Sequence, residues 1–95
     1  MLLPLGSVLI PQDGNMRMMV VGRRTYLPDI GQIMDYTLVP WPQGDVGDED
    51  GNPDIYYLMH DQVGELIHEG YSDEEDVEHV LFLEGLNKDD YVVAV

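Results

Sequence analysis

Short apolar runs separated by turn residues make up the first half of the chain. Residues 6–10 are apolar and partly β-branched, and Pro11 and Asp13-Gly14-Asn15 follow them. Residues 16–26 form a second, nearly continuous run. Two such runs joined by a glycine-containing turn predict a β-hairpin. We expect the second run to be central and covered on both faces at its middle, with Gly22 marking a bulge or a close backbone approach.

Three further runs have the character of strands. In residues 34–39, Met34, Tyr36 and Leu38 alternate with Asp35, Thr37 and Val39, as expected of a strand with two different faces. Residues 55–59 are rich in aromatic side chains, and residues 65–71 form a fifth extended segment. Between these two, residues 60–62 are predicted to form one helical turn.

A helix is predicted from about residue 73 to residue 84 or 86. Ser72 and Glu75 have the spacing of a capping box, and the acids that follow Ser72 suit the positive end of the helix dipole. Gly70 is expected to allow the bend before the helix. Val77, Val80 and Leu81 give an apolar stripe at helical spacing.

The C-terminal end carries more apolar surface than one face of a small sheet requires. Phe82, Leu83 and Leu86 extend the apolar character around the helix, and residues 91–95 have the composition of an unpaired edge strand. We therefore expect residues 80–95 to take part in an intermolecular contact, either in a homodimer or with another protein. A sixth strand added to the chain's own sheet is the open alternative.

These elements predict one α+β domain over residues 1–95. Its expected architecture is a small, mostly antiparallel, five-stranded curved sheet or open barrel with one C-terminal helix. Residues 45–54 are expected to be an acidic, mobile loop, and residues 87–95 a C-terminal tail. No basic leader, no cysteine and no apolar run of about 18 residues is present, so a cytoplasmic protein without a membrane span or disulfides is expected.

The net charge of −15 is concentrated in the second half of the chain. Three arginines balance three aspartates in residues 1–42, whereas Lys88 alone opposes the sixteen acids of residues 43–95. Such a field repels nucleic acids and anionic membranes and attracts basic partners. A solvated surface that keeps the protein soluble is the simpler interpretation.

No pattern indicates catalysis or a cofactor. An EF-hand loop read from Asp48 fails, because Pro53 stands where glycine is required; a casual cation site there stays open. His60, His68 and His79 form no metal-binding spacing. Neither serine lies in a nucleophile elbow, and no glycine loop precedes a helix to hold phosphate. We therefore expect a protein that is not an enzyme.

The order of several short motifs resembles a known family. Leu3-Pro4-Leu5-Gly6-Ser7-Val8, Val21-Gly22-Arg23, His60-Asp61 and Glu69-Gly70-Tyr71 followed by acids are similar to a family of small, uncharacterised proteins of Gram-positive bacteria. The resemblance covers roughly residues 3–76, and the tail has no counterpart. Genes of that family lie beside type VII secretion systems and their LXG-type toxins. The resemblance therefore implies a cellular setting, the cytoplasm of a cell that exports toxins, but no mechanism.

Two functional hypotheses follow. The first is an accessory protein, an adaptor or targeting chaperone, that binds an LXG-type toxin or its helical partner. Its apolar contact residues would be Val80, Phe82, Leu83, Leu86 and Tyr91. The second is an immunity protein that blocks a basic toxin surface with carboxylates. The residues for that role would be Glu69, Asp73, Glu74, Glu75, Asp76 and Glu78.

Overall fold

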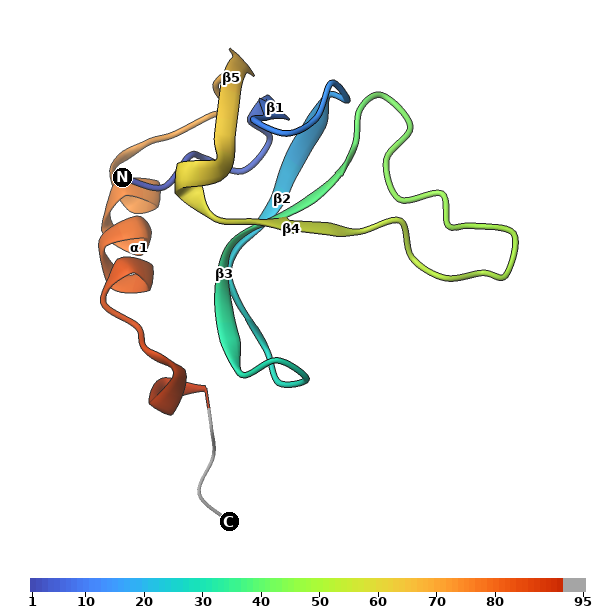
Figure 1. Ribbon diagram of the computed structural model, residues 1–95. Coiled ribbons are helices and arrows are strands. Elements are labelled where there is room, and N and C mark those ends of the chain that lie inside the picture. Colours follow the sequence, from blue (N-terminus) through green and yellow to red (C-terminus); the bar gives the residue numbers. More distant parts are fainter. Residues whose placement is uncertain (92–95) are drawn as a thin grey trace.

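The computed structural model describes residues 1–91 and contains a curved, unclosed antiparallel sheet of five strands with one α-helix beside it (Figure 1). The strands are β1 (Val8–Pro11), β2 (Met18–Leu27), β3 (Gln32–Pro40), β4 (Tyr56–Leu58) and β5 (Val63–His68), arranged in the order β4-β3-β2-β1-β5. The helix α1 spans Glu74–Glu84. The predicted α+β fold with one helix near its C-terminus is confirmed.

The local predictions for the strands are largely confirmed, but β5 spans Val63–His68 instead of residues 65–71 and the predicted cover of β2 is incomplete. β1 and β2 form the expected hairpin, and the 3₁₀ turn η1 (His60–Gln62) lies between β4 and β5. The pairing of β2 with β3 skips a residue between Val20 and Gly22, so a bulge lies there. The expectation of cover on both faces is wrong at this point, because Val21 is 44% exposed.

The core lies between one face of the sheet and α1. Tyr36 and Leu38, two residues apart on β3, are fully buried, as the alternation predicts. Leu9 and Val20 join them from the neighbouring strands, and Val80 and Leu83 of α1 close the cluster. The helix is therefore fixed to the sheet mainly by the burial of two side chains.

Two arginines of β2 add polar links between the sheet and α1. The Arg23 guanidinium lies 2.8 Å from the Asp76 carboxylate in the first half of the helix, and its side chain is only 4% exposed. Arg24 donates to the carbonyls of Leu83 and Leu86 at the C-terminal end and also pairs with Asp35. Cations at this end suit the helix dipole. The two guanidiniums thus hold both ends of the helix.

The start of α1 differs from the prediction in its capping residue. Asp73 is the N-cap, and its carboxylate accepts a hydrogen bond from the Asp76 backbone N–H at 2.9 Å. The Ser72 hydroxyl donates instead to the Asp76 carboxylate. The predicted capping box of Ser72 and Glu75 is therefore wrong by one residue, because an aspartate is as good an N-cap as a serine.

Gly70 is required for a reason other than the predicted bend. A Cβ at this position would lie 2.1 Å from the Leu5 carbonyl oxygen and 2.9 Å from the Ser7 nitrogen. The Gly70 N–H also donates to the Ser7 hydroxyl. The segment after β5 therefore packs backbone against backbone on the N-terminal segment.

Two segments predicted to be irregular have defined local structure. In the loop between β3 and β4, which projects away from the sheet in Figure 1, the Asp48 carboxylate accepts from the backbone N–H groups of Asp50 and Asn52. The mobility of residues 45–54 stays a prediction. After α1, a 3₁₀ turn η2 (Lys88–Asp90) leads to Tyr91, which stacks on Tyr26 and donates to the Arg24 carbonyl. The rest of the predicted edge strand, residues 92–95, lies outside the described residues.

Candidate functional site

The side of α1 turned away from the sheet carries exposed apolar side chains. Val77, Leu81 and Phe82 are 37%, 59% and 62% exposed. Val77 and Leu81 are one helical turn apart, so they lie on the same side of the helix. We call these three residues, together with Glu74 and Glu78, the outer face of α1. Apolar side chains exposed next to one another mark a surface suited to binding another protein.

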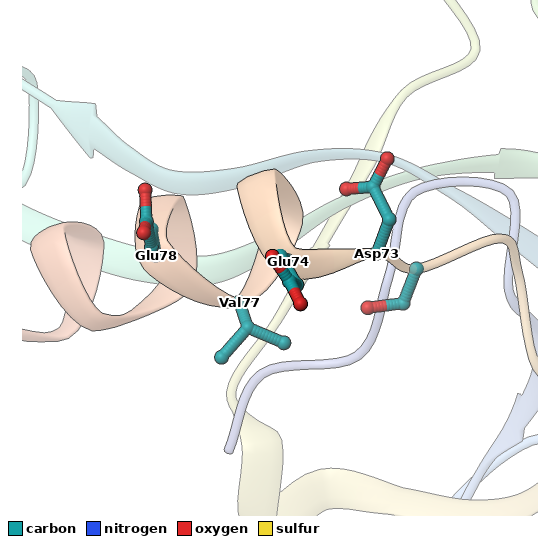
Figure 2. A pocket seen from close by; sticks show the side chains of 5 residues that line it. Asp73, Glu74, Val77 and Glu78 are labelled. Atoms are coloured by element: carbon teal, nitrogen blue, oxygen red, sulfur yellow. The ribbon is translucent and has the colours of Figure 1, made fainter.

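Carboxylates occupy the N-terminal half of this face. A shallow hollow of about 450 Å³ lies at the start of α1 and is lined by Ser72, Asp73, Glu74, Val77 and Glu78 (Figure 2). Its lining therefore combines one apolar side chain with three acidic ones. Such a lining suits the long side chain of lysine or arginine, whose stem is apolar and whose head is cationic.

The six acids predicted for an acidic surface divide into two groups. Asp73 and Asp76 serve the fold, the first as the cap of α1 and the second as the partner of Arg23. The hydrogen bond from Arg23, with a smaller contribution from Ser72, holds the pKa of Asp76 below its usual value. The others are exposed and lie on α1 or just before it: Glu69, Glu74, Glu75 and Glu78. Asp73 is exposed as well, but its carboxylate already accepts hydrogen bonds from the Asp76 N–H and the Tyr71 hydroxyl, so the second group is the more available to a partner.

The five predicted apolar contact residues are also separated by the structure. Val80 and Leu83 are buried in the core, and Leu86 packs against it. Tyr91 is held against β2 by its stack on Tyr26. Phe82 alone is largely exposed. In this conformation a partner would thus meet Phe82 together with Val77 and Leu81, two residues of the predicted apolar stripe.

The sequence contained a signal for this outer position. Successive residues of a helix are about 100° apart, so Leu81 stands about 100° from Val80 while Leu83 stands about 60° from it on the other side. If Val80 and Leu83 face the core, Leu81 is turned outward. Together with Leu83, the stripe of Val77, Val80 and Leu81 spans about 160° of the helix, which is more than the stripe of about 100° that usually faces a core.

The most chemically distinctive buried group is the hydroxyl of Tyr36. It accepts the backbone N–H of Leu3 at 2.9 Å and is hydrogen-bonded to Nδ1 of His60. Burial is the main reason why the pKa of Tyr36 is raised. The His60 backbone N–H in turn donates to Asp35. These bonds fasten the N-terminal segment and η1 to β3, which is a structural role.

A comparison with protein-family models places the chain in a family. Residues 2–79 match the model of a domain of unknown function, DUF4176. The chain belongs to the DUF4176 family. No curated protein and no solved structure shows a significant match to it.

The boundary of the DUF4176 match falls inside α1. It includes Glu74, Val77 and Glu78 and ends before Leu81 and Phe82. The hollow at the start of α1 therefore belongs to the part that matches the family model, while the more exposed apolar residues follow that part.

Across residues 1–91, no three His, Cys, Asp or Glu side chains are arranged to hold a metal ion. Asp48, the strongest candidate, is engaged by the backbone N–H groups and the side chain of Asn52, and these bonds lower its pKa. No helix in the same part of the chain has both the length and the apolar character to cross a bilayer.

Proposed function

We propose that this DUF4176 chain is a non-enzymatic adaptor that binds a protein through the outer face of α1. On this proposal the partner is an LXG-type toxin of a type VII secretion system, or that toxin's helical partner. The chain would act in the cytoplasm of a Gram-positive bacterium, before export. The secretion setting rests on the resemblance of the short motifs in residues 3–76, because the match of residues 2–79 is to a domain of unknown function and names no setting.

One observation carries the proposal. Val77, Leu81 and Phe82 stay exposed although the core next to them buries Val80 and Leu83 almost completely. Fully burying an exposed apolar side chain contributes about 1.5–3 kcal/mol. The exposed parts of Val77, Leu81 and Phe82, whose ring stacks on His79, are therefore a reserve of binding free energy. A partner that covers them with an apolar centre and a polar rim would have the usual anatomy of a protein interface.

The test is co-purification from the native host, with mass spectrometry of the bound proteins. We expect the tagged chain to retain a product of a neighbouring toxin locus. We also expect the double variant Leu81→Gln/Phe82→Gln to lose it. The matched control is Ile30→Gln/Val46→Gln, which alters two residues that are 63% and 71% exposed in loops. A chain that stays alone with every product of its locus would refute the proposal.

The exposed carboxylates favour a second candidate, an immunity protein. Glu69, Glu74, Glu75 and Glu78 present a dense negative field without a neighbouring cation on α1. Such a surface would block a basic toxin face and associate with it rapidly at low salt. Co-expression separates the two ideas. An immunity protein protects a cell that makes the toxin domain, whereas an adaptor affects export of the toxin.

A third hypothesis is that the same apolar surface binds a second copy of the chain and forms a homodimer. Residues 80–95 would then contact another copy, with Phe82 as the exposed anchor among the described residues. Measurement of the mass in solution over a range of protein concentrations tests this reading. A mass of 10.8 kDa at every concentration would exclude it.

A further inference from the structure

The outer face of α1 limits the kind of structure that can bind to it. A helix face offers a partner no free backbone donors or acceptors, because the helix uses them itself. A single extended peptide laid on it, outside any sheet of its own, would leave its backbone groups unpaired. A second α-helix satisfies its own backbone and can pack a ridge of side chains beside Val77 and Leu81. For a single segment of a partner, the form that fits is therefore helical.

The charge of the same face determines the chemistry of that helix. From Glu74 to Glu84, α1 contains acids and His79 but no lysine or arginine. The nearest arginines, Arg23 and Arg24, are turned inward to Asp76, Asp35 and backbone carbonyls. A second copy would bring another net charge of −15 and an equally acidic helix. A cationic partner is complementary where a second copy is not.

Glu74 and Glu78 add a specific reason for a cation. They are one helical turn apart, and two like charges at this spacing destabilise a helix. In the described part of the chain neither carboxylate accepts a hydrogen bond, whereas the neighbouring Asp73 is occupied by the Asp76 N–H and the Tyr71 hydroxyl. Both glutamates line the hollow together with Val77 (Figure 2). A cationic head placed there would remove the repulsion.

We propose that the outer face of α1 binds a basic amphipathic helix. The apolar side of that helix packs on Val77, Leu81 and Phe82. A lysine or arginine near one end enters the hollow, with its stem against Val77 and its charge beside Glu74 and Glu78. This inference rests on the proposed adaptor function and specifies the chemistry of its partner.

The probe is a synthetic 18-residue amphipathic helix of leucine and lysine, compared with a scrambled peptide of the same composition. Binding is measured by isothermal titration calorimetry at about 150 mM salt, where charges farther apart than about 8 Å are screened. We expect the amphipathic peptide to bind at least tenfold more tightly than the scrambled one. Equal affinity would show attraction to net charge alone and would overturn the inference.

Two pairs of variants place the peptide on the protein. Leu81→Gln/Phe82→Gln should weaken binding at least tenfold, and its control Ile30→Gln/Val46→Gln should not weaken it. Glu74→Gln/Glu75→Gln/Glu78→Gln should weaken binding at least fivefold. Its control, Asp29→Asn/Glu49→Gln/Asp50→Asn, removes the same charge from exposed positions on loops and should change affinity less than twofold. If a control variant weakens binding as much as its counterpart, the inference is wrong.

The same variants separate this inference from the proposed function. A native partner that co-purifies equally well with Leu81→Gln/Phe82→Gln would leave an adaptor role standing, but it would refute the outer face of α1 as the contact surface and with it the helix-binding inference. If the peptide binds as described but the host yields no partner, the binding face stands and the adaptor role fails.

Discussion

At the scale of single residues, Gly70 is the position where one added methyl group should have the largest effect. The Cβ of alanine would lie 2.1 Å from the Leu5 carbonyl oxygen, and the clashing atoms are backbone. Gly70→Ala should therefore lower the free energy of unfolding by about 1–3 kcal/mol, the usual cost of overpacking. Urea unfolding followed by circular dichroism measures this change.

Gly85→Ala is the matched control. Gly85 has φ −84° in the right-handed helical region, and the nearest atom to an added Cβ is 3.5 Å away. We expect this variant to be as stable as the wild type or slightly more stable, because alanine restricts the unfolded chain. Equal losses at both glycines would show that close packing is not what Gly70 provides.

Asp76 should give the protein a pH-dependent contribution to stability. Its folded pKa is lowered, chiefly by the hydrogen bond from Arg23. The contribution is therefore complete above the unfolded pKa of about 4 and is lost as the pH falls through the lower folded pKa. Asp76→Asn should lower the free energy of unfolding at pH 7 by about 1.5–3 kcal/mol, the usual value of a hydrogen bond to a charged group.

The pH profile distinguishes this ion pair from simple packing. The difference between wild type and Asp76→Asn should shrink as the pH is lowered below about 4, in urea titrations at each pH. The exposed Glu75→Gln serves as the control and should change stability by about 0.5 kcal/mol or less at pH 7. A difference for Asp76→Asn that is constant with pH would contradict the role given to its charge.

The sequence pattern indicated that Gly70 and the acidic start of the helix are structurally important. It did not indicate why position 70 requires glycine or which residue caps α1. The reason for Gly70 is the close approach of the Leu5 and Ser7 backbone, and Ser7 is 63 residues away in the chain. No local pattern reveals such a contact. The cap was misassigned because Ser72 and Asp73 are adjacent and equally suitable. Only the three-dimensional path of the chain decides which of them hydrogen-bonds to the Asp76 N–H.

At the scale of elements, the N-cap of α1 can be tested directly. Asp73→Ala should lower the free energy of unfolding by about 0.5–2 kcal/mol, because it leaves the Asp76 N–H without its acceptor. Ser72→Ala removes only a hydroxyl that donates to the Asp76 side chain, and it should cost less. Urea unfolding of the two variants provides the comparison, and a larger loss for Ser72→Ala would restore the original assignment of the cap.

The strands were more predictable than the orientation of the helix. Alternation in residues 34–39 indicates which face of the strand meets the core, and Tyr36 and Leu38 are buried as it indicates, although Val39 on the other face is buried as well. Apolar residues surround too much of α1 for the same inference. The orientation of α1 about its own axis is set by its contacts with Arg23 and Arg24 and by the burial of Val80 and Leu83. These contacts join parts of the chain that are distant in sequence. For this reason the predicted contact surface was rotated away from the exposed one.

At the scale of the whole molecule, the sequence predicted an acidic and apolar C-terminal half but not how these properties combine. The charge count located the acids, and the apolar excess located the helix end. The structure brings Val77 and Leu81 beside Glu74 and Glu78 on one face, and it assigns Asp73 and Asp76 to the fold. A surface with both characters fits a partner that is itself both apolar and cationic, which neither property alone specifies.

The excess of negative charge should make the stability of the whole protein rise with salt. Sixteen acids and one lysine lie in residues 43–95, and two ion pairs, Arg23–Asp76 and Arg24–Asp35, link cations to acids in the described residues. Repulsion among the remaining carboxylates destabilises the compact state.

Raising sodium chloride from about 20 mM to about 500 mM shortens the Debye length from about 20 Å to about 4 Å. The urea midpoint should therefore increase. The variant Asp29→Asn/Glu49→Gln/Asp50→Asn, which carries three fewer negative charges, should show a smaller increase. A midpoint that falls with salt would mean that the two arginine pairs outweigh the repulsion, and the strongly acidic surface would then have no measurable cost to the free protein.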